Sequence, residues 1–329
     1  MAVSANRPAS PVHVVGVGMI PFSKPGASAP YAQMGEQAAR AALQDAGVDY
    51  ASVQQAYVGY VYGDSTCGQA AVYGVGLTGI PVVNVTNNCS TGSTALFLAR
   101  QAVASGAADC VLALGFEQMQ PGALKSHWDD RPPPTARFID AMQAHQGYDP
   151  AAPRAAQFFG GAGRDYMRQY GIAPETFGRI AVKARQHAAR NPLAVFRQPL
   201  TLEEVMASST VWGPLTRFQC CPPTCGAAAA IVCSAEFARR HGLDMRVRIA
   251  AQAMTTDTAS SFDSGDMRRL VGYDMARAAA AQVYEAAGIG PEDLDVVELH
   301  DCFTANELLT YEALGLTPEG TAERFIVEG

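Results

Sequence analysis

The chain has 329 residues, of which 48% are hydrophobic and 17% charged, and its 24 basic and 31 acidic residues give a net charge of −7. This length predicts two or three domains, and this composition excludes an intrinsically disordered chain. The acidic balance excludes the basic surface of a general nucleic-acid binder, and no apolar run reaches the ~18 residues of a membrane span. We therefore expect a folded protein with no nucleic-acid partner and no membrane span.

Strand and helix patterns alternate at the start of the chain. A continuous apolar run at 12–19 is typical of a strand buried on both faces. Its Gly16-x-Gly18 pair lacks the third glycine of a dinucleotide-binding loop, so we interpret the pair as a tight strand exit. A helix is predicted at about 33–46 and ends before Gly47. Further strands are predicted at 56–62, 81–85 and 109–114.

The region from about 120 to 225 has a different character. It contains Arg-Pro-Pro-Pro at 131–134 and helical patterns at 155–170 and 174–189. A strand pattern returns at 227–233. We interpret the region as a long insertion between two sheet elements, and insertions of this size usually shape a binding site.

The last part of the chain resembles its beginning. Residues 247–254 resemble 12–19, and a predicted helix at 275–287 and a predicted strand at 296–299 follow in the same order as in the first part. Two matches in the same order indicate a duplicated strand–helix–strand unit. The sequence therefore predicts an α/β fold with parallel sheets and two pseudo-symmetric halves. From the repeat we also expect that the second half is not yet complete at residue 329.

Eight cysteines occur, and no secretory signal precedes them, so a disulfide framework is not expected. Cys220, Cys221 and Cys225 lie close enough in sequence to suggest zinc. However, no Cys-x-x-Cys pair and no histidine at ligand spacing accompany them. We therefore favour structural thiols over a metal site, and we expect no metal.

Cys89 lies at a predicted strand–helix junction, within Asn-Asn-Cys-Ser-Thr-Gly-Ser at 87–93. The amino end of a helix carries N–H groups without helical partners and a positive dipole end, both of which stabilise a thiolate. This setting suits a nucleophilic cysteine. The alternative is a small buried thiol, which position alone leaves open.

His300 and Cys302 form a second candidate site, within Glu-Leu-His-Asp-Cys-Phe at 298–303. They follow a predicted strand and precede a predicted helix at 304–314, so they are expected at the carboxyl end of a strand, where ligands bind in open sheets. A histidine can donate to a carbonyl oxygen and a cysteine can transfer a proton. Asp301 is expected to cap the helix or to orient its neighbours. A satisfied histidine and a core cysteine remain the alternative.

These motifs together resemble the thiolase superfamily. Besides 87–93 and 300–303, the resemblance rests on Asn-Glu-Leu-Leu at 306–309, Gly-Asp-Ser-Thr-Cys-Gly at 63–68 and Leu-Ala-Leu-Gly-Phe-Glu at 112–117. The chain is most similar to the sterol carrier protein 2-type branch, which comprises 3-ketoacyl-CoA thiolases and lipid-transfer proteins. The resemblance covers nearly the whole chain.

The resemblance implies the thiolase fold, in which two pseudo-symmetric βαβαβ-type halves form five layers. The expected organisation is an N-terminal half at 1–119 plus 226–240 and a loop domain at 120–225 that covers CoA and the acyl chain. The C-terminal half is expected at 241–329 and is incomplete. The resemblance also implies a homodimer through 82–88.

The implied reaction is the CoA-dependent cleavage of a 3-oxoacyl-CoA in fatty-acid or sterol side-chain β-oxidation. Cys89 is the expected nucleophile that attacks the 3-keto carbon. Cys302 is the expected acid/base, which protonates the departing enolate and then deprotonates CoA. His300 is expected to bind the enolate oxygen in an oxyanion hole. Coenzyme A is a co-substrate, and the reaction needs no bound cofactor.

The sequence also departs from the family pattern. The family has a Gly-His-Pro motif whose histidine activates the nucleophile, and these 329 residues contain none. Loss of such a base typically costs ~10²–10⁴-fold in rate. One alternative is a thiolase-like aldolase or lyase that acts on β-hydroxyacyl-CoA with a partner subunit. A tyrosine in place of His300 would favour this alternative, so the histidine argues against it. Another is an inactive acyl-CoA-binding fragment. The arginine-rich composition is typical of a bacterial, cytoplasmic protein; a eukaryotic one is expected in peroxisomes.

Overall fold

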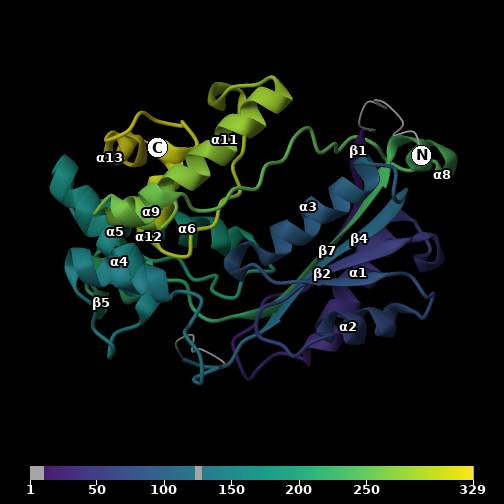
Figure 1. Ribbon diagram of the computed structural model, residues 1–329, viewed down its shortest axis with the longest axis horizontal. Helices are drawn as coiled ribbons and strands as arrows, with labels where there is room; N and C mark the ends of the chain where they lie inside the picture. The colour runs from purple at the N-terminus through teal and green to yellow at the C-terminus, as the bar shows by residue number, and fades with distance from the viewer. Residues whose placement is uncertain (1–10, 123–127, 329) are drawn as a thin grey trace. The chain divides into compact units, whose positions relative to one another are not determined.

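The computed structural model describes residues 11–122 and 128–328 and divides into two compact units (Figure 1). Both units are discontinuous in sequence. The first comprises Met1–Pro121, Leu193–Val195 and Pro223–Gln252, and the second comprises Gly122–Pro192, Phe196–Pro222 and Ala253–Gly329. In the parts of the chain given above, no helix has the length and hydropathy of a membrane span.

A five-stranded sheet organises the first unit, in the order β1-β7-β4-β2-β3. The prediction of a parallel sheet is wrong for one strand, since β7 runs antiparallel to both of its neighbours while β2 pairs in parallel with β3 and β4. The reason is that Gln118, the end of β4, pairs with Cys225, the start of β7. The chain leaves the sheet and returns to it at the same end of the strands, so β7 runs in the direction opposite to β4. The strands are β1 (Val12–Met19), β2 (Gln55–Gly59), β3 (Val82–Val85), β4 (Cys110–Gln118) and β7 (Cys225–Ser234).

Helices cover both faces of this sheet, which gives the unit three layers (Figure 1). On one face lie α1 (Tyr31–Ala46) and α2 (Cys67–Val75), and on the other lies α3 (Thr91–Ala104). A short helix, α8 (Ala235–His241), follows β7. The predicted helix at 33–46 is confirmed as α1, and Gly47 ends it in the left-handed conformation with φ 66°.

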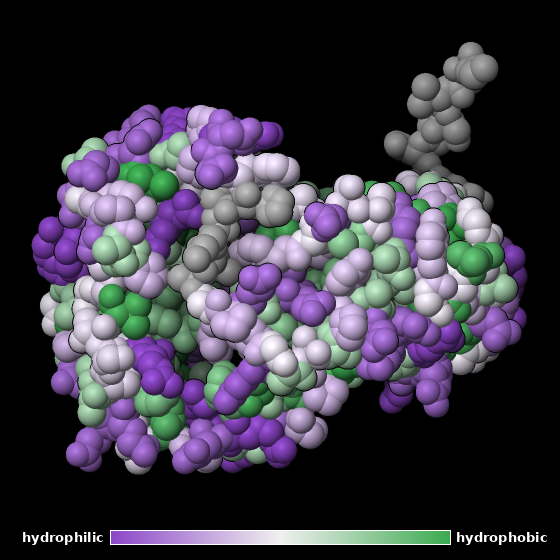
Figure 2. All heavy atoms as spheres, turned by 90° about the horizontal axis from the view of Figure 1, so that it is seen from below, coloured by the Kyte–Doolittle hydropathy of each residue, from purple (hydrophilic) through white to green (hydrophobic). Residues whose placement is uncertain are grey.

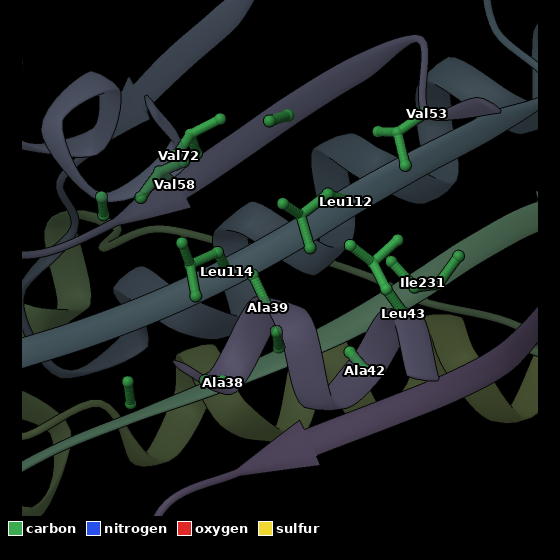
Figure 3. Close-up of a cluster of buried hydrophobic side chains, with 14 of the residues drawn as sticks. Ala38, Ala39, Ala42, Leu43, Val53, Val58, Val72, Leu112, Leu114 and Ile231 are labelled. Atoms are coloured by element: carbon green, nitrogen blue, oxygen red, sulfur yellow. The ribbon is translucent and has the colours of Figure 1, made fainter. Parts of the chain in front are cut away.

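Alanine-rich packing holds α1 close to the sheet. Figure 3 shows the small side chains of α1, among them Ala38 and Ala42, on the side where Leu112, Leu114 and Ile231 project from β4 and β7; these residues belong to one buried cluster. A Cβ atom at Gly16 would lie 2.4 Å from the carbonyl oxygen of Ala42. The Gly16-x-Gly18 pair therefore serves close helix–strand contact, since a Cβ at Gly18 would likewise lie 2.3 Å from the carbonyl oxygen of Ala38.

The second unit is mainly helical. Its core contains Met142, Tyr166, Phe177 and Leu308, all of them fully buried. The predicted helices at 155–170, 174–189, 275–287 and 304–314 are confirmed with small shifts at their ends. The elements are α4 (Ala136–Gln146), α5 (Arg154–Tyr170), α6 (Glu175–Arg190), α7 (Leu202–Met206), α9 (Ala259–Asp263), α10 (Met267–Leu270), α11 (Tyr273–Ala287), α12 (Thr304–Ala313) and α13 (Ala322–Glu328), with a two-stranded ribbon of β5 (Thr210–Trp212) and β6 (Leu215–Thr216).

The predicted strands at 247–254 and 296–299 are wrong. Both segments are irregular apart from a single bridge between His13 and Arg248. Val247 is 59% exposed and Val296 is 84% exposed. A strand forms only where a neighbour accepts and donates its backbone hydrogen bonds along several residues. The first segment makes two such bonds with β1, from the Val14 N–H to the Val247 carbonyl and from the Ile249 N–H to the Val12 carbonyl, and the pairing does not continue beyond Ile249. Among the described residues, no strand pairs with 296–299.

Two carboxylates are buried in α12. The Glu307 carboxylate forms an ion pair with Lys183 and accepts a hydrogen bond from the Tyr311 hydroxyl. Glu312 accepts hydrogen bonds from the Tyr166 hydroxyl and from two backbone N–H groups at 320 and 322. These bonds fix α12 against α5 and α6.

On the surface drawn in Figure 2, the hydrophobic residues form separate spots among hydrophilic ones.

Candidate functional site

Cys89 lies in a single 3-10 turn, Asn88–Ser90, between the end of β3 and the start of α3. The strand–helix junction predicted from the sequence is therefore confirmed. The side chain of Cys89 is exposed, unlike those of Cys110 and Cys233, which lie in the sheet and are fully buried. The turn begins with Asn88 at φ 45°, a left-handed conformation that non-glycine residues seldom adopt. The surrounding structure has to hold such a residue in place.

Side-chain hydrogen bonds hold this turn. The buried Thr91 hydroxyl accepts from the backbone N–H of Asn87 at 2.7 Å and donates to the backbone carbonyl of Asn88 at 2.6 Å. The Ser90 hydroxyl donates to the Asn87 carbonyl at 2.8 Å. The hydroxyl groups of Thr91 and Ser90 therefore satisfy backbone groups of the turn that carries Cys89.

Glycines bring the start of α3 against the sheet. A Cβ atom at Gly59, the last residue of β2, would lie 2.8 Å from Cγ2 and 2.9 Å from the backbone oxygen of Thr91. A Cβ at Gly115 in β4 would lie 3.7 Å from the Cα of Gly92. The first turn of α3 thus packs directly on two strands, and this contact sets the height of the Cys89 turn above the sheet edge.

The pKa of the Cys89 thiol is raised, whereas its position at the start of a helix predicts that it is lowered. Burial raises it above its ordinary value, and the backbone hydrogen bond that lowers it is the smaller effect. The exposed surface of the side chain does not remove this effect, because protein atoms around the sulfur still replace part of its water. The thiol is therefore protonated at neutral pH, and nucleophilic attack requires a base to remove its proton.

His300 and Cys302 lie in the irregular segment that leads into α12. The His300 backbone carbonyl accepts a hydrogen bond from Asn306 Nδ2 at 2.6 Å, which ties the segment to the first turn of α12. His300 is exposed, and Cys302 is 5% exposed. Burial lowers the pKa of the His300 imidazole more than Asp301 raises it, so the ring is neutral at pH 7 and keeps one N–H donor.

The start of α12 differs in detail from the expectation. The N-cap position is Phe303, and no side chain caps the helix, so the capping role expected for Asp301 is wrong. Phe303 stacks on Phe159 with ring centroids 4.9 Å apart, which anchors the segment in the core. The buried Thr304 hydroxyl has no hydrogen-bond partner.

Sequence reasoning missed Cys221. Cys220 and Phe303 form an antiparallel bridge, and the Cys221 backbone N–H donates to the Cys302 carbonyl at 2.8 Å. The backbone of Cys221 therefore lies beside that of Cys302, next to an isolated bridge. No periodicity or spacing could reveal this pairing, because the two residues are 81 positions apart in the chain (302 − 221 = 81).

The cysteines at 220, 221 and 225 do not form a metal cluster. Cys220 and Cys221 belong to the second unit, and Cys225 begins β7 in the first, where its thiol donates to the Met119 carbonyl at 3.4 Å. Across the described residues, no group of three or more histidine, cysteine or carboxylate side chains is arranged to hold a metal ion.

The expected site residues are divided between the units. Cys89 belongs to the first, whereas His300 and Cys302 belong to the second together with Cys221 and Asn306. Within the second unit the structure thus brings together a neutral imidazole and a buried thiol from three consecutive residues, 300–302, and an exposed thiol from the facing segment. This set of groups can donate hydrogen bonds and exchange protons.

Comparison with known families gives two matches. The family described as Thiolase, N-terminal domain matches residues 12–236, and the one described as Thiolase C-terminal domain-like matches 256–329. The chain is 50% identical to Sterol carrier protein 2 of Rattus norvegicus over 333 residues, which cover 100% of this chain and 61% of that protein. It is 40% identical to Non-specific lipid-transfer protein-like 2 of Caenorhabditis elegans, covering 96% of this chain and 78% of that one. It is 35% identical to Benzoylsuccinyl-CoA thiolase subunit BbsB of Thauera aromatica, covering 97% and 79%.

Solved structures give a consistent picture of the fold. The chain matches a structure titled Ltp2-ChsH2(DUF35) aldolase with a TM-score of 0.80 and 26% identity, covering 98% of this chain and 81% of that one. It matches human mitochondrial 3-ketoacyl-CoA thiolase with a TM-score of 0.73 and 18% identity, covering 96% and 86%. The thiolase fold expected from the sequence is therefore confirmed.

Proposed function

The chain belongs to the thiolase family, and we propose that it is an acyl-CoA C-acyltransferase that cleaves 3-oxoacyl-CoA with CoA. The observation that carries this proposal is the position of Cys89, an exposed thiol held on a constrained turn at the start of α3. Relatives whose names contain thiolase and sterol carrier support the reaction class. That the acyl group comes from fatty-acid or sterol side-chain β-oxidation is part of the proposal.

The proposed reaction begins when the Cys89 thiolate attacks the 3-keto carbon. The bond between the 2- and 3-carbons breaks, the acyl group remains on Cys89, and its electrons form the enolate of a shorter acyl-CoA. A neutral His300 suits the oxyanion hole, because its N–H can donate to the enolate oxygen without a change of protonation. Cys302 gives its proton to the enolate carbon and recovers one from the incoming CoA thiol, which takes the acyl group from Cys89.

The raised pKa of Cys89 makes its activation the demanding step. The histidine of the family's Gly-His-Pro motif has no counterpart in these 329 residues. We therefore expect acylation of this 329-residue chain to be slower than in a thiolase that carries the motif by about 10²–10⁴-fold, the usual contribution of a general base.

The test is CoA-dependent cleavage of a 3-oxoacyl-CoA by the 329-residue chain, followed by mass spectrometry of both the acyl-CoA products and the intact protein. We expect shorter acyl-CoA and an acyl adduct on Cys89, both absent in Cys89→Ala. An adduct without turnover supports Cys89 as the nucleophile but refutes transferase activity of the isolated chain. Cleavage that persists in Cys89→Ala refutes the assignment of the nucleophile.

A second candidate is an aldolase that cleaves β-hydroxyacyl-CoA with a partner subunit. The similarity to the Ltp2-ChsH2(DUF35) aldolase favours it. The retained His300 favours the acyltransferase instead. The two are separated by supplying β-hydroxyacyl-CoA without CoA, because aldol cleavage releases a carbonyl product and needs no thiol acceptor.

We further propose a homodimer through 82–88. β3 lies at the edge of the sheet, and its Val83 is 42% exposed. An open hollow of about 420 Å³ lies beside it, lined in part by Tyr73 and Leu77, which are also exposed. An edge strand with exposed apolar side chains is suited to pair with the same strand of a second copy.

A further inference from the structure

The turn that carries Cys89 contains one residue in a strained conformation. Asn88, the residue before Cys89, has φ 45°, which lies in the left-handed region that is unfavourable for residues other than glycine. The Asn88 side chain is exposed, so its own packing does not impose this conformation. Another contact therefore has to hold the backbone at Asn88.

The Thr91 hydroxyl provides this contact, because it bonds backbone groups on both sides of the strained torsion. It accepts a hydrogen bond from the Asn87 N–H at 2.7 Å and donates one to the Asn88 carbonyl at 2.6 Å. The φ angle of Asn88 is one of the few rotations between these two groups. Because both groups are held on one oxygen atom, a change of this angle to its ordinary negative range has to break one of the bonds.

Thr91 is itself fixed in place. The residue is 5% exposed, so water does not replace the two bonds of its hydroxyl. Its methyl group lies against Gly59 of β2, where a Cβ atom would come within 2.8 Å of it. Contact of the methyl group with the strand restricts χ1 and so directs the hydroxyl. Ser90 also bonds the Asn87 carbonyl, at 2.8 Å, but Ser90 is exposed and competes with water for this bond.

We propose that Thr91 is a positioning residue for Cys89: its hydroxyl holds Asn88 in the left-handed conformation and thereby sets the direction in which the turn presents the thiol. Cys89 directly follows Asn88, so a rotation at Asn88 turns the backbone that carries the sulfur. The consequence for catalysis rests on the proposed function, since Thr91 affects acyl transfer only through the position of Cys89.

Two substitutions separate the hydroxyl of Thr91 from its methyl group. Thr91→Val keeps the shape and removes both bonds, whereas Thr91→Ser keeps the hydroxyl and removes the contact with Gly59. The measurement is the protection of the amides at 87–91 against hydrogen exchange, relative to the unfolded chain. We expect protection to fall about tenfold in Thr91→Val, which corresponds to ~1.4 kcal/mol, and to stay near that of the parent chain in Thr91→Ser. The matched control Thr216→Val removes a buried hydroxyl that donates to the Val205 carbonyl in the second unit, and it should leave 87–91 unchanged.

Substitution of Asn88 tests the strain while Thr91 is retained. The position is exposed, so these variants do not disturb the core. Glycine adopts φ 45° without steric cost, whereas a β-branched residue is a clear outlier there. We therefore expect Asn88→Gly to keep the protection of the parent chain and Asn88→Val to lose it by about tenfold. In the double variant, Asn88→Gly should restore part of the protection that Thr91→Val loses, because glycine gains less by leaving the left-handed region.

Turnover gives the functional readout. For the cleavage of 3-oxoacyl-CoA we expect Thr91→Val to lower kcat by about tenfold with KM nearly unchanged, because the variant alters the position of the nucleophile and not the binding of substrate. Thr91→Ser should retain the kcat of the parent chain.

Three results would overturn the proposal. The first is full protection of 87–91 in Thr91→Val. The second is an equal loss in Thr91→Ser and Thr91→Val, because the methyl contact would then hold the turn. The third is equal protection in Asn88→Gly and Asn88→Val. The exchange measurements need no substrate, so a chain that shows the expected exchange but no turnover contradicts the proposed function and still supports the role of Thr91.

Discussion

The contact between β2 and the start of α3 gives a prediction with opposite signs at two glycines. In Gly59→Ala the new methyl group meets Thr91 at 2.8 Å through its side chain and at 2.9 Å through its backbone oxygen. A flexible side chain could move aside, but the backbone of a helix cannot do so without displacing the helix. In Gly92→Ala, by contrast, the new methyl group has no atom within 4 Å.

The magnitudes follow from these distances. Overpacking of this kind costs about 1–3 kcal/mol, and loss of backbone freedom in the unfolded chain returns about 0.4–1 kcal/mol. We therefore expect Gly59→Ala to lower the free energy of unfolding by about 0.5–2 kcal/mol. Gly92 lies inside α3, so Gly92→Ala is expected to raise it by about 0.5–1 kcal/mol.

The assay is urea unfolding followed by far-UV circular dichroism. Both tryptophans, Trp128 and Trp212, belong to the second unit, so their fluorescence is the weaker reporter for a change at the sheet. We also expect Gly59→Ala to change the alkylation rate of Cys89, because the displaced helix carries its turn. The reasoning is refuted if Gly59→Ala is as stable as the parent chain, or if both substitutions shift the midpoint in the same direction.

Three further predictions concern other parts of the molecule. The rate of Cys89 alkylation by a haloacetamide should rise with pH and show no plateau below the ordinary thiol range of about 8–9, because the pKa of Cys89 is raised. At every pH this rate should exceed that of the buried Cys110, whose pKa is raised to about 12. Slower labelling of Cys89 than of Cys110 contradicts the role of Cys89 as nucleophile. Val83→Asp should shift the protein from dimer to monomer in light scattering with unchanged circular dichroism, whereas an unchanged mass excludes this edge as the interface. Glu307→Gln should lower the free energy of unfolding by about 1–3 kcal/mol, because the buried carboxylate interacts with both Lys183 and Tyr311. Lys183→Met removes only the half-exposed partner and should have the smaller effect. The reverse order in urea unfolding contradicts this account.

Local patterns in the sequence were sufficient to predict the long helices α1, α5, α6, α11 and α12 and the strands of the first unit, but not the shorter helices. Continuous apolar runs identified β1 and β7, and glycine after α1 marked its end. The Cys89 junction was also predictable, since the turn residues around it occur between an apolar strand and a helix. These features depend on neighbours in the chain, so the sequence contains their cause.

The strands predicted at 247–254 and 296–299 show the limit of this reasoning. Their composition suits a strand, but a strand requires hydrogen bonds to another segment, and composition does not contain that segment. The direction of β7 had the same kind of cause. It depends on where the chain returns after an insertion of about a hundred residues, which no local pattern specifies.

The sequence by itself determined the family, the identity of the expected nucleophile and the residues His300 and Cys302 that accompany it. The tertiary structure decided what surrounds each group, because burial and pairing arise from segments distant in the chain. It raised the pKa of Cys89, where a helix start alone indicated the opposite. It also placed the backbone of Cys221 beside that of Cys302, since a backbone hydrogen bond next to an isolated bridge joins residues that no spacing rule connects.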